Sequence, residues 1–361
     1  MDLLTTTINL DAIAHNVRTI KAKVAPAQLM AVVKADGYNH GAAEVARVML
    51  QNGADRLGVA TLAEAHALRD AGIDAPVLAW IWSPEQDFRS AIAAGISLGI
   101  PTLAHAHAIV GLDCEVAIKV DTGLHRSGVP ESQWRECFEL LANSTATVTG
   151  LFSHLSSADN PDDPATDAQE ETFTRAIEQA KSCGLAVPVN HLANSPATLT
   201  RPDLHHQMVR PGLICYGLEP IPGLKHDLKP AMTWAGRVTM VSDISEGEGT
   251  SYSLTWHAPE YGHYCIVPAG YADGLPRAVQ GHLEVTINGK RYPQVGRVCM
   301  DQIVVWLGQD TATPGDMAII FGEGGMSATE LADAIGTINY EVACWPKGRT
   351  VRHYIGGHNE S

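Results

Sequence analysis

The chain has 361 residues, of which 45% are hydrophobic and 18% are charged, and its formal net charge is −15. This length and composition predict one large and one smaller globular domain rather than a disordered chain. The acidic excess excludes nucleic acid and anionic membranes as expected partners, and no apolar run reaches the roughly 20 residues that a membrane-spanning helix needs.

The cysteines and the N-terminus indicate a cytoplasmic protein. The seven cysteines are widely separated, odd in number and contain no Cys-x-x-Cys pair, a pattern typical of reduced thiols. Residues 1–7 have neither the basic segment nor the apolar segment of a secretory signal.

The first two thirds of the chain contain short apolar segments typical of strands, separated by helical patterns or polar loops. These segments are residues 29–33, 56–60, 76–80, 97–100, 115–120, 149–153, 188–191 and 208–214. Residues 42–52 and 62–71 have the periodicity of amphipathic helices, and Gly72 caps the second. Eight such repeats favour a parallel (β/α)8 barrel of the TIM type, with a doubly wound open sheet as the alternative.

Beyond about Pro230 the pattern changes to closely spaced strands. They are expected at residues 236–241, 264–267, 283–287, 303–306 and 317–320, with one helix-like segment at 327–335. Asn288-Gly289 follows an alternating strand and predicts a hairpin turn. We therefore expect a barrel over residues 9–228 and a mostly antiparallel β domain over 229–361, which residues 1–8 join.

Lys34 follows the first apolar segment directly and is the first candidate site residue. At the tip of a valine-rich strand a lysine is partly desolvated, which lowers its pKa and leaves an amine able to form a Schiff base. A lysine that extends its charge into solvent is the alternative.

Polar side chains also follow the later barrel strands, where the active site of such a barrel lies. They are Lys119 at the end of the fifth segment and Arg126 beyond it, His154 after the sixth, Ser195 after the seventh and Arg210 in the eighth. The turn Pro211-Gly212-Leu213 offers backbone N–H groups to a phosphate. A lysine, a phosphate site and an imidazole together suggest pyridoxal 5′-phosphate. A core histidine at 154 and a structural ion pair at Arg210 remain alternatives.

Nine motifs in order resemble the alanine racemase family over nearly the whole chain. They are residues 31–38, 119–128, 152–154, 191–195, 210–217, 250–253, 269–274, 296–302 and 337–341. The resemblance implies a barrel with a C-terminal β domain, pyridoxal 5′-phosphate as cofactor, and a head-to-tail homodimer with shared active sites.

The implied reaction is the interconversion of L- and D-alanine. Racemisation removes a proton from one face of Cα and returns one to the other, so two bases must flank the substrate. By resemblance these are Lys34, the Schiff-base lysine, on the D face and Tyr252 of the partner subunit on the L face. The product D-alanine would serve peptidoglycan synthesis, or the enzyme would serve alanine catabolism.

The resemblance also implies the remaining roles. Arg126 contacts the Tyr252 phenol and the substrate carboxylate, and Arg210 faces the pyridine nitrogen, which it leaves unprotonated. Lys119 occupies a position that is often carbamylated. The phosphate would be held by Tyr38, Ser195, Gly212, Leu213 and Tyr340, with His154 stacked on the ring. Tyr271, Met300 and Asp301 would line the substrate side.

Some positions depart from the family pattern, and some competing functions stay open. Asp36-Gly37-Tyr38-Asn39 replaces the usual Asn-Ala-Tyr-Gly, and Leu124 and Ser127 replace methionine and leucine beside Arg126. Tyr340 favours alanine, although a broader alanine/serine racemase remains an alternative.

A decarboxylase using Cys299 and a non-catalytic cofactor carrier also remain. Arg210 argues against the decarboxylase, which needs an acidic partner for the pyridine nitrogen, and Tyr252 argues against the carrier.

Two further patterns are interpreted as structural. Gly95-Ile96-Ser97-Leu98-Gly99 matches the nucleophile elbow of hydrolases but lacks a following helix. The histidine pairs 105/107 and 205/206 lack a third ligand at a metal-binding spacing, so no metal site is expected.

Overall fold

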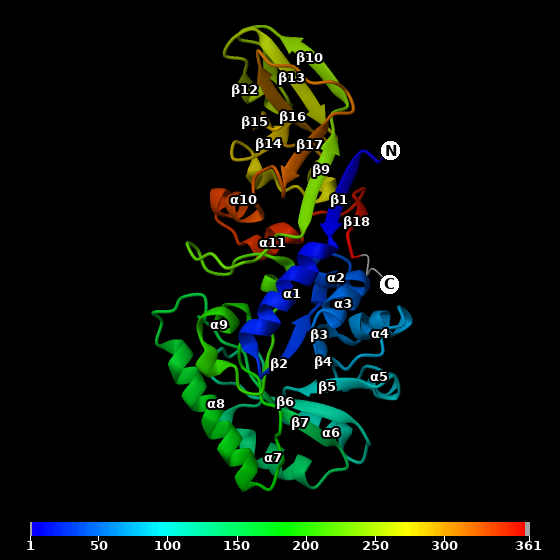
Figure 1. The fold of residues 1–361 in the computed structure, drawn as a ribbon, viewed down its shortest axis with the longest axis vertical. Coiled ribbons are helices and arrows are strands. Elements are labelled where there is room, and N and C mark those ends of the chain that lie inside the picture. Colours follow the sequence, from blue (N-terminus) through cyan, green and yellow to red (C-terminus); the bar gives the residue numbers. More distant parts are fainter. Residues whose placement is uncertain (1, 358–361) are drawn as a thin grey trace. The chain divides into compact units, whose positions relative to one another are not determined.

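The computed structural model describes residues 2–357, which form two compact units (Figure 1). One unit spans Ile13–Leu228, and the other combines the residues up to Ala12 with those from Lys229 onward. In the described part of the chain, no helix is both long enough and apolar enough to cross a bilayer.

The Ile13–Leu228 unit is built on a curled parallel sheet, which confirms the predicted barrel class. Its strands are β2 (Gln28–Val32), β3 (Arg56–Thr61), β4 (Val77–Ile81), β5 (Ile96–Ile100), β6 (Glu115–Lys119), β7 (Thr147–Phe152) and β8 (Met208–Val209). They are ordered β7-β6-β5-β4-β3-β2-β8. The interior is filled by buried side chains that include Met30, Leu78 and Phe152.

The seventh predicted strand, residues 188–191, is not a regular strand, and that prediction is wrong. Pro188 has no N–H to donate, and the segment forms only an isolated bridge between Phe152 and His191. It is nevertheless bonded on both sides. Val189 N donates to Thr149 O at 2.9 Å on the β7 side, and Gln207 N donates to Asn190 O at 3.2 Å on the β8 side. This segment therefore closes the barrel between β7 and β8, and residues 189–193 are called the seam below.

The eighth strand is shorter than the predicted range 208–214. It contains Met208–Val209 alone, and the chain continues into a 3-10 turn at Leu213–Tyr216. Pro211 lacks a donor for the ladder, and Gly212 follows it directly. The polar end of this strand is therefore a turn that exposes backbone N–H groups.

Helices accompany the strands in alternation (Figure 1). They are α1 (Leu10–Val24), α2 (Lys34–Tyr38), α3 (Ala42–Gln51), α4 (Leu62–Asp70), α5 (Phe88–Ala93), α6 (Leu103–Ile109), α7 (Trp134–Ala142), α8 (Ala165–Ser182) and α9 (Ser195–Thr200). The predicted helices at 42–52 and 62–71 are confirmed as α3 and α4. A capping box between Thr61 and Glu64 starts α4, and Gly72 follows its end with φ of +76°.

The second unit is a nine-stranded sheet in which all pairings are antiparallel except that of β1 with β18. Its strands are β1 (Leu4–Asn9), β9 (Met232–Arg237), β10 (Met240–Ile244), β13 (Gly262–Val267), β14 (Glu284–Ile287), β15 (Lys290–Val295), β16 (Ile303–Gly308), β17 (Met317–Phe321) and β18 (Val351–Ile355). The ribbon of β11 (Gly249–Thr250) and β12 (Trp256–His257) and the helices α10 (Ala328–Ile335) and α11 (Asn339–Ala343) complete it.

Local signals account for much of this unit. Asn288 and Gly289 have φ of +50° and +80°, as the predicted hairpin turn between β14 and β15 requires. The single strand predicted at 236–241 is wrong, because two strands meet there. Val238 N donates toward β17 at Asp316 O, whereas Thr239 N donates to Ile266 O of β13. The change of partner breaks the strand.

Candidate active site

Lys34 begins a turn of unusual hand at the end of β2. Residues 35–39 all have positive φ, between +51° and +65°. Of these only Gly37 adopts the left-handed region without penalty, while each other residue loses about 1–2 kcal/mol. Contacts from elsewhere must therefore hold this segment, which we call the left-handed turn.

Two carboxylates hold the left-handed turn. Glu64 of α4 accepts the N–H of Ala35 at 2.8 Å through one oxygen, and its other oxygen accepts Ala60 N and Thr61 N. Asp36 accepts the N–H of Ala42 at 2.8 Å. The turn is thus tied to the first residues of α3 and α4, and its geometry depends on both helices.

The left-handed turn places Tyr38 next to Lys34 and against the eighth strand end. Lys34 Nζ lies 5.9 Å from the centre of the Tyr38 ring, and that ring lies 4.9 Å from the ring of Tyr216. A Cβ atom added to Gly212 would lie 2.2 Å from the Tyr38 hydroxyl oxygen. Only glycine at position 212 allows the hydroxyl to reach this place.

Gly212 also meets Ser195, the first residue of α9. Its N–H donates to Ser195 Oγ at 3.0 Å, and Ser195, Tyr38 and Leu213 are buried. Two hydroxyl groups and the backbone N–H groups of a turn therefore converge at one point, at the strand ends next to Lys34. This cradle, formed by Tyr38, Ser195, Gly212 and Leu213, has the donors that a phosphate group requires.

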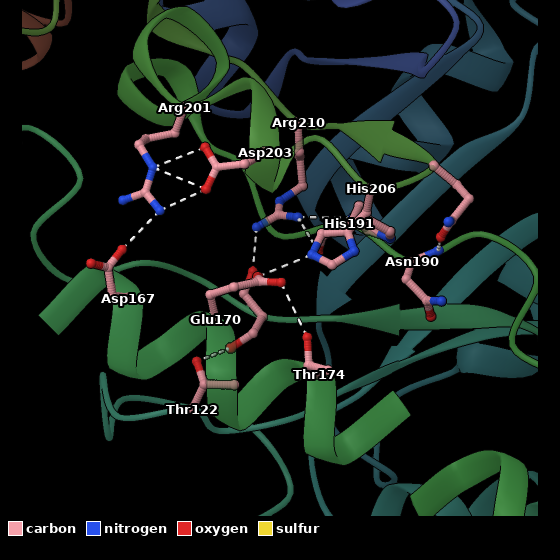
Figure 2. Close-up of polar contacts among 12 residues, drawn as sticks. Thr122, Asp167, Glu170, Thr174, Asn190, His191, Arg201, Asp203, His206 and Arg210 are labelled. Carbon is pink, nitrogen blue, oxygen red and sulfur yellow. Dashed lines mark hydrogen bonds and ion pairs between the residues drawn. The ribbon is translucent and has the colours of Figure 1, made fainter. Parts of the chain in front are cut away.

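Arg210 lies between two imidazoles (Figure 2 shows it beside His191). Its guanidinium donates to His191 Nδ1 at 2.8 Å, to Ser153 O at 2.5 Å and to His154 Nδ1 at 3.3 Å. Among residues 2–357 no carboxylate pairs with it. Because arginine only donates, both Nδ1 atoms must accept, so both rings are neutral with the proton on Nε2.

Burial and the Arg210 cation hold the pKa values of His154 and His191 well below their usual range. Burial also lowers the pKa of Arg210 to about 10, so the guanidinium stays charged at neutral pH. Arg210 is thus a buried, fixed cation with neutral neighbours.

Lys119 and Arg126 complete the barrel part of the site. Burial, followed by the charges of Arg210, Arg126 and Lys34, lowers the pKa of the Lys119 amine to about 8. Asp121 accepts the backbone N–H of Gly123 and of His125 and orders the loop that leads to Arg126. A buried amine among cations is chemically poised to lose its proton.

A polar network lies behind His154. Gln169 of α8 donates to Thr122 Oγ1 and to the carbonyl of His154, and Thr122 in turn contacts Ser153 Oγ at 2.8 Å. On the same helix Glu170 accepts from His206 at 3.0 Å (Figure 2). The Gln169 side chain therefore ties the His154 backbone to α8, and Glu170 ties His206 to the same helix.

The β unit gathers a second set of predicted residues. Tyr252 is 67% exposed and lines a cavity of about 540 Å³ together with Met300, Asp301 and their neighbours. Tyr271 joins this set through its N–H, which donates to Cys299 O at 3.1 Å. The structure thus brings Tyr252, Met300 and Asp301 together at this cavity, with the Tyr271 backbone beside it, whereas Tyr340 lies on α11 and is not among the lining residues.

Three participants carried no assigned role in the sequence interpretation. Arg349 binds the fully buried Asp273 through two nitrogens at 2.8 Å and Asp301 through a third at 2.7 Å, which holds the Asp301 carboxylate. Asp273 and His191 lie inside recognised motifs, which is a signal for both. Arg349 has no sequence signal, because its partners are distant in the chain.

The remaining sequence candidates are structural. Ser97 donates to Glu115 at 3.0 Å from within β5, so it is not a nucleophile on an elbow. His105 and His205 contact the backbone carbonyls of Trp82 and Thr198. In the described part of the chain no cluster of three or more His, Cys, Asp or Glu side chains could hold a metal ion.

The fold and its strand-end cluster define a two-domain barrel enzyme, with a lysine and a cradle of hydroxyl and backbone N–H groups at the strand ends of the barrel. The model of the alanine racemase N-terminal domain matches residues 8–220, and that of the C-terminal domain matches residues 231–354. The chain belongs to the alanine racemase family.

Relatives and solved structures agree over the full length. The alanine racemase of Corynebacterium efficiens is 62% identical, with 99% of each chain covered, and that of Mycobacterium tuberculosis is 46% identical, covering 98% of this chain and 96% of its own. The crystal structure of alanine racemase from Corynebacterium glutamicum is 53% identical, with a TM-score of 0.91 over 98% of this chain and 100% of that chain. The crystal structure of alanine racemase from a D-cycloserine-producing Streptomyces lavendulae is 38% identical, with a TM-score of 0.95 over 99% of this chain and 98% of that chain.

Proposed function

We propose that this chain interconverts L- and D-alanine with pyridoxal 5′-phosphate held in the barrel and with active sites completed by a second copy of the chain. The observation that carries the cofactor assignment is the cradle of Tyr38, Ser195 and Gly212 next to Lys34. Its donors suit a phosphate, and the neighbouring amine suits an aldehyde.

The residues of the barrel fit the cofactor group by group. Lys34 supplies the amine, and the cradle supplies donors for the phosphate, to which the family resemblance adds Tyr340. When bound, the cofactor withdraws electron density from Cα of the amino acid and makes its proton removable.

Arg210 supplies a charged donor for the pyridine nitrogen, and His154 supplies a neutral ring for stacking. Because the guanidinium keeps its own proton at neutral pH, it holds that nitrogen as an acceptor. No acidic group among residues 2–357 pairs with Arg210, so the site lacks the carboxylate that would protonate the nitrogen. This arrangement favours racemisation over decarboxylation.

Two bases from different units of the chain handle the proton. Lys34 Nζ takes and returns the proton on the D face of Cα, and the Tyr252 phenol oxygen does so on the L face. A phenol has a pKa near about 10 and needs a nearby cation to act as a base at neutral pH. Arg126 would supply that cation and bind the substrate carboxylate.

Lys119 would act as a carbamate. Its lowered pKa leaves far more neutral amine at neutral pH than an ordinary lysine has, and the neutral amine adds to carbon dioxide with loss of a proton. The product is an anion among Arg126, Arg210 and Lys34, so a group of like charges becomes a paired one. The carbamate would hold Arg126 in place.

The exposure of the β-unit residues supports a homodimer. Tyr252, Met300 and Tyr271 are 67%, 51% and 42% exposed, although two are proposed to bind substrate and one to react with it. Large exposed apolar and aromatic side chains, two of which line the same cavity, are typical of an interface.

The seven cysteines are all free, which supports a reducing compartment such as the cytoplasm.

The decisive experiment incubates the purified protein with L-alanine in D2O and follows optical rotation and the Cα–H signal. We expect inversion with incorporation of solvent deuterium, and absence of both with cofactor bound would refute the proposal. Lys34→Ala should lose the visible absorbance of the lysine-bound cofactor, whereas Tyr252→Phe should keep it and lose inversion. Parallel reactions with L-serine measure the breadth of specificity.

A further inference from the structure

The turn that carries Tyr252 has a strained backbone. Ser251 has φ of +64° and ψ of −177°, and Ser253 and Leu254 have φ of +62° and +45°. These conformations are favourable for glycine and unfavourable for serine and leucine. We call residues 251–254 the Tyr252 turn. Its shape persists only if neighbouring groups hold it.

The Ser251 hydroxyl is the main side-chain contact that holds the Tyr252 turn. Ser251 Oγ donates to the carbonyl oxygen of Arg297 at 2.8 Å and lies 3.5 Å from Cys299 Sγ, which also reaches the Arg297 carbonyl. Within the turn, Leu254 N donates to Ser251 O at 3.1 Å. The hydroxyl therefore ties the strained residue to the loop between β15 and β16.

That loop is itself fixed, and its shape matches Ser251. Gly296 has φ of +65°, and a Cβ atom added there would lie 2.7 Å from the Cβ of Ser251. The buried Gln294 side chain donates to the carbonyls of Val295 and Gly296 at 2.7 and 3.0 Å. The serine thus packs on a glycine whose backbone is held from inside the β unit.

The Tyr252 side chain has few supports of its own within its unit. It is 67% exposed, so side-chain packing in the β unit does little to orient the phenol. Its direction over the cavity is set by the backbone at residues 251 and 253. A contact that fixes this backbone therefore controls where the phenol oxygen lies.

We propose that Ser251 is a positioning residue that holds the second base, Tyr252, through its hydrogen bond to the Arg297 carbonyl. This inference rests on the proposed function, in which Tyr252 exchanges the proton on the L face. Loss of the bond would displace the phenol and leave Lys34, which is carried by the other unit, untouched. The two half-reactions would then be affected unequally.

The test compares Cα–H exchange with inversion in D2O for Ser251→Ala. Starting from D-alanine, Lys34 still releases the proton and returns a deuteron, so exchange without inversion should increase relative to inversion. We expect inversion to fall about tenfold, the effect of one lost hydrogen bond, and the exchange-to-inversion ratio to rise by a similar factor. From L-alanine, exchange and inversion should fall together.

Ser251→Gly provides a second variant that removes the hydroxyl and also relieves the strain, so it keeps the experiment valid if the alanine variant folds poorly. Ser245→Ala, in an exposed turn of the same unit, is the matched control and should leave rate and ratio unchanged. An unchanged rate, or equal losses of exchange and inversion from D-alanine in both variants, would overturn the role of Ser251. Failure of the unmodified enzyme to invert alanine would instead refute the proposed function.

Discussion

Arg210 determines the protonation state of the two histidines beside it, because a guanidinium donates hydrogen bonds and cannot accept them. Its contacts with His154 and His191 leave each imidazole one tautomer, and burial keeps both rings neutral. The sequence predicts that an arginine lies at this strand end. It does not predict that two histidines from neighbouring strand ends share the arginine, because that depends on how the seam joins β7 and β8.

Substitution of Gly212 by alanine tests the cradle without imposing backbone strain. The φ of −114° at Gly212 suits alanine, but the new Cβ would lie 2.2 Å from the Tyr38 hydroxyl oxygen. We expect Gly212→Ala to displace that hydroxyl and raise the dissociation constant for pyridoxal 5′-phosphate by about tenfold or more. Titration of cofactor-free protein by visible absorbance measures this. An unchanged constant in a normally folded variant would rule out phosphate binding at this point.

Lys119 gives the free energy of unfolding a definite pH dependence. Its folded pKa of about 8 lies below the ordinary 10.5, so between these values the unfolded chain binds more protons and stability rises with pH. Below pH 8 the buried charge lowers stability in full. In carbonate-free buffer, the free energy of unfolding of Lys119→Met should therefore exceed that of the unmodified protein by about 1–3 kcal/mol at pH 7. It should also lack the increase between pH 8 and pH 10.

Urea unfolding at several pH values checks this expectation, with the exposed Lys181→Met as control. Bicarbonate should stabilise the unmodified protein and leave Lys119→Met unaffected. Equal responses of the two proteins to bicarbonate would contradict carbamylation at this lysine.

At the scale of elements, the left-handed turn shows what local sequence leaves out. Asp36-Gly37 and Asn39 are turn-forming residues, and the sequence predicts a turn there. Five consecutive positive φ values are not predictable, since Ala35 and Tyr38 disfavour them and the compensation comes from Glu64, which is 29 residues from Ala35. The turn that follows Lys34 therefore depends on Glu64, which also completes the cap of α4.

Glu64→Ala should loosen this dependence. The substitution removes the acceptor of three backbone N–H groups, and we expect a loss of about 1–3 kcal/mol in stability together with weaker cofactor binding. Glu330→Ala is a matched control, because Glu330 completes the capping box of α10 but belongs to the β unit. It should lower stability while cofactor binding stays normal. Equal cofactor affinities in the two variants would contradict the role of Glu64 in holding the left-handed turn for cofactor binding.

Most strands were predictable because alternation and turn residues act locally. The errors fall at residues 188–191, 208–214 and 236–241, where proline, a 3-10 turn or a change of strand partner overrides the apolar pattern. Each error concerns pairing with a distant segment. The polar residues near the ends of the seventh and eighth predicted strands still meet in the structure, since Arg210 contacts His191 and His154, and Gly212 contacts Ser195.

At the scale of the whole molecule, the two proposed bases belong to different units. Lys34 lies in the unit of residues 13–228, and Tyr252 lies in the unit that begins at Lys229. The sequence alone implies that the tyrosine comes from a partner only through the family resemblance. A direct test is therefore needed.

Mixing inactive subunits provides it. Heterodimers of Lys34→Ala and Tyr252→Phe contain one site with both native bases and one site with neither. Equal mixing yields about half heterodimers, so activity should recover to about a quarter of the unmodified level. No recovery, despite heterodimers confirmed by differently tagged subunits, would contradict a shared site.

The seam is expected to open more often than the other strand pairings of the barrel. Residues 189–193 close it with scattered backbone bonds in place of a continuous ladder, so their amide hydrogens should exchange with solvent faster than those of β3 to β6. Ser195 and Gly212 lie beyond the seam, and Lys34 follows β2. A cofactor bound to Ser195, Gly212 and Lys34 would link the strand ends on both sides of the seam and reduce its opening. Hydrogen exchange along the seam should therefore slow when pyridoxal 5′-phosphate is added.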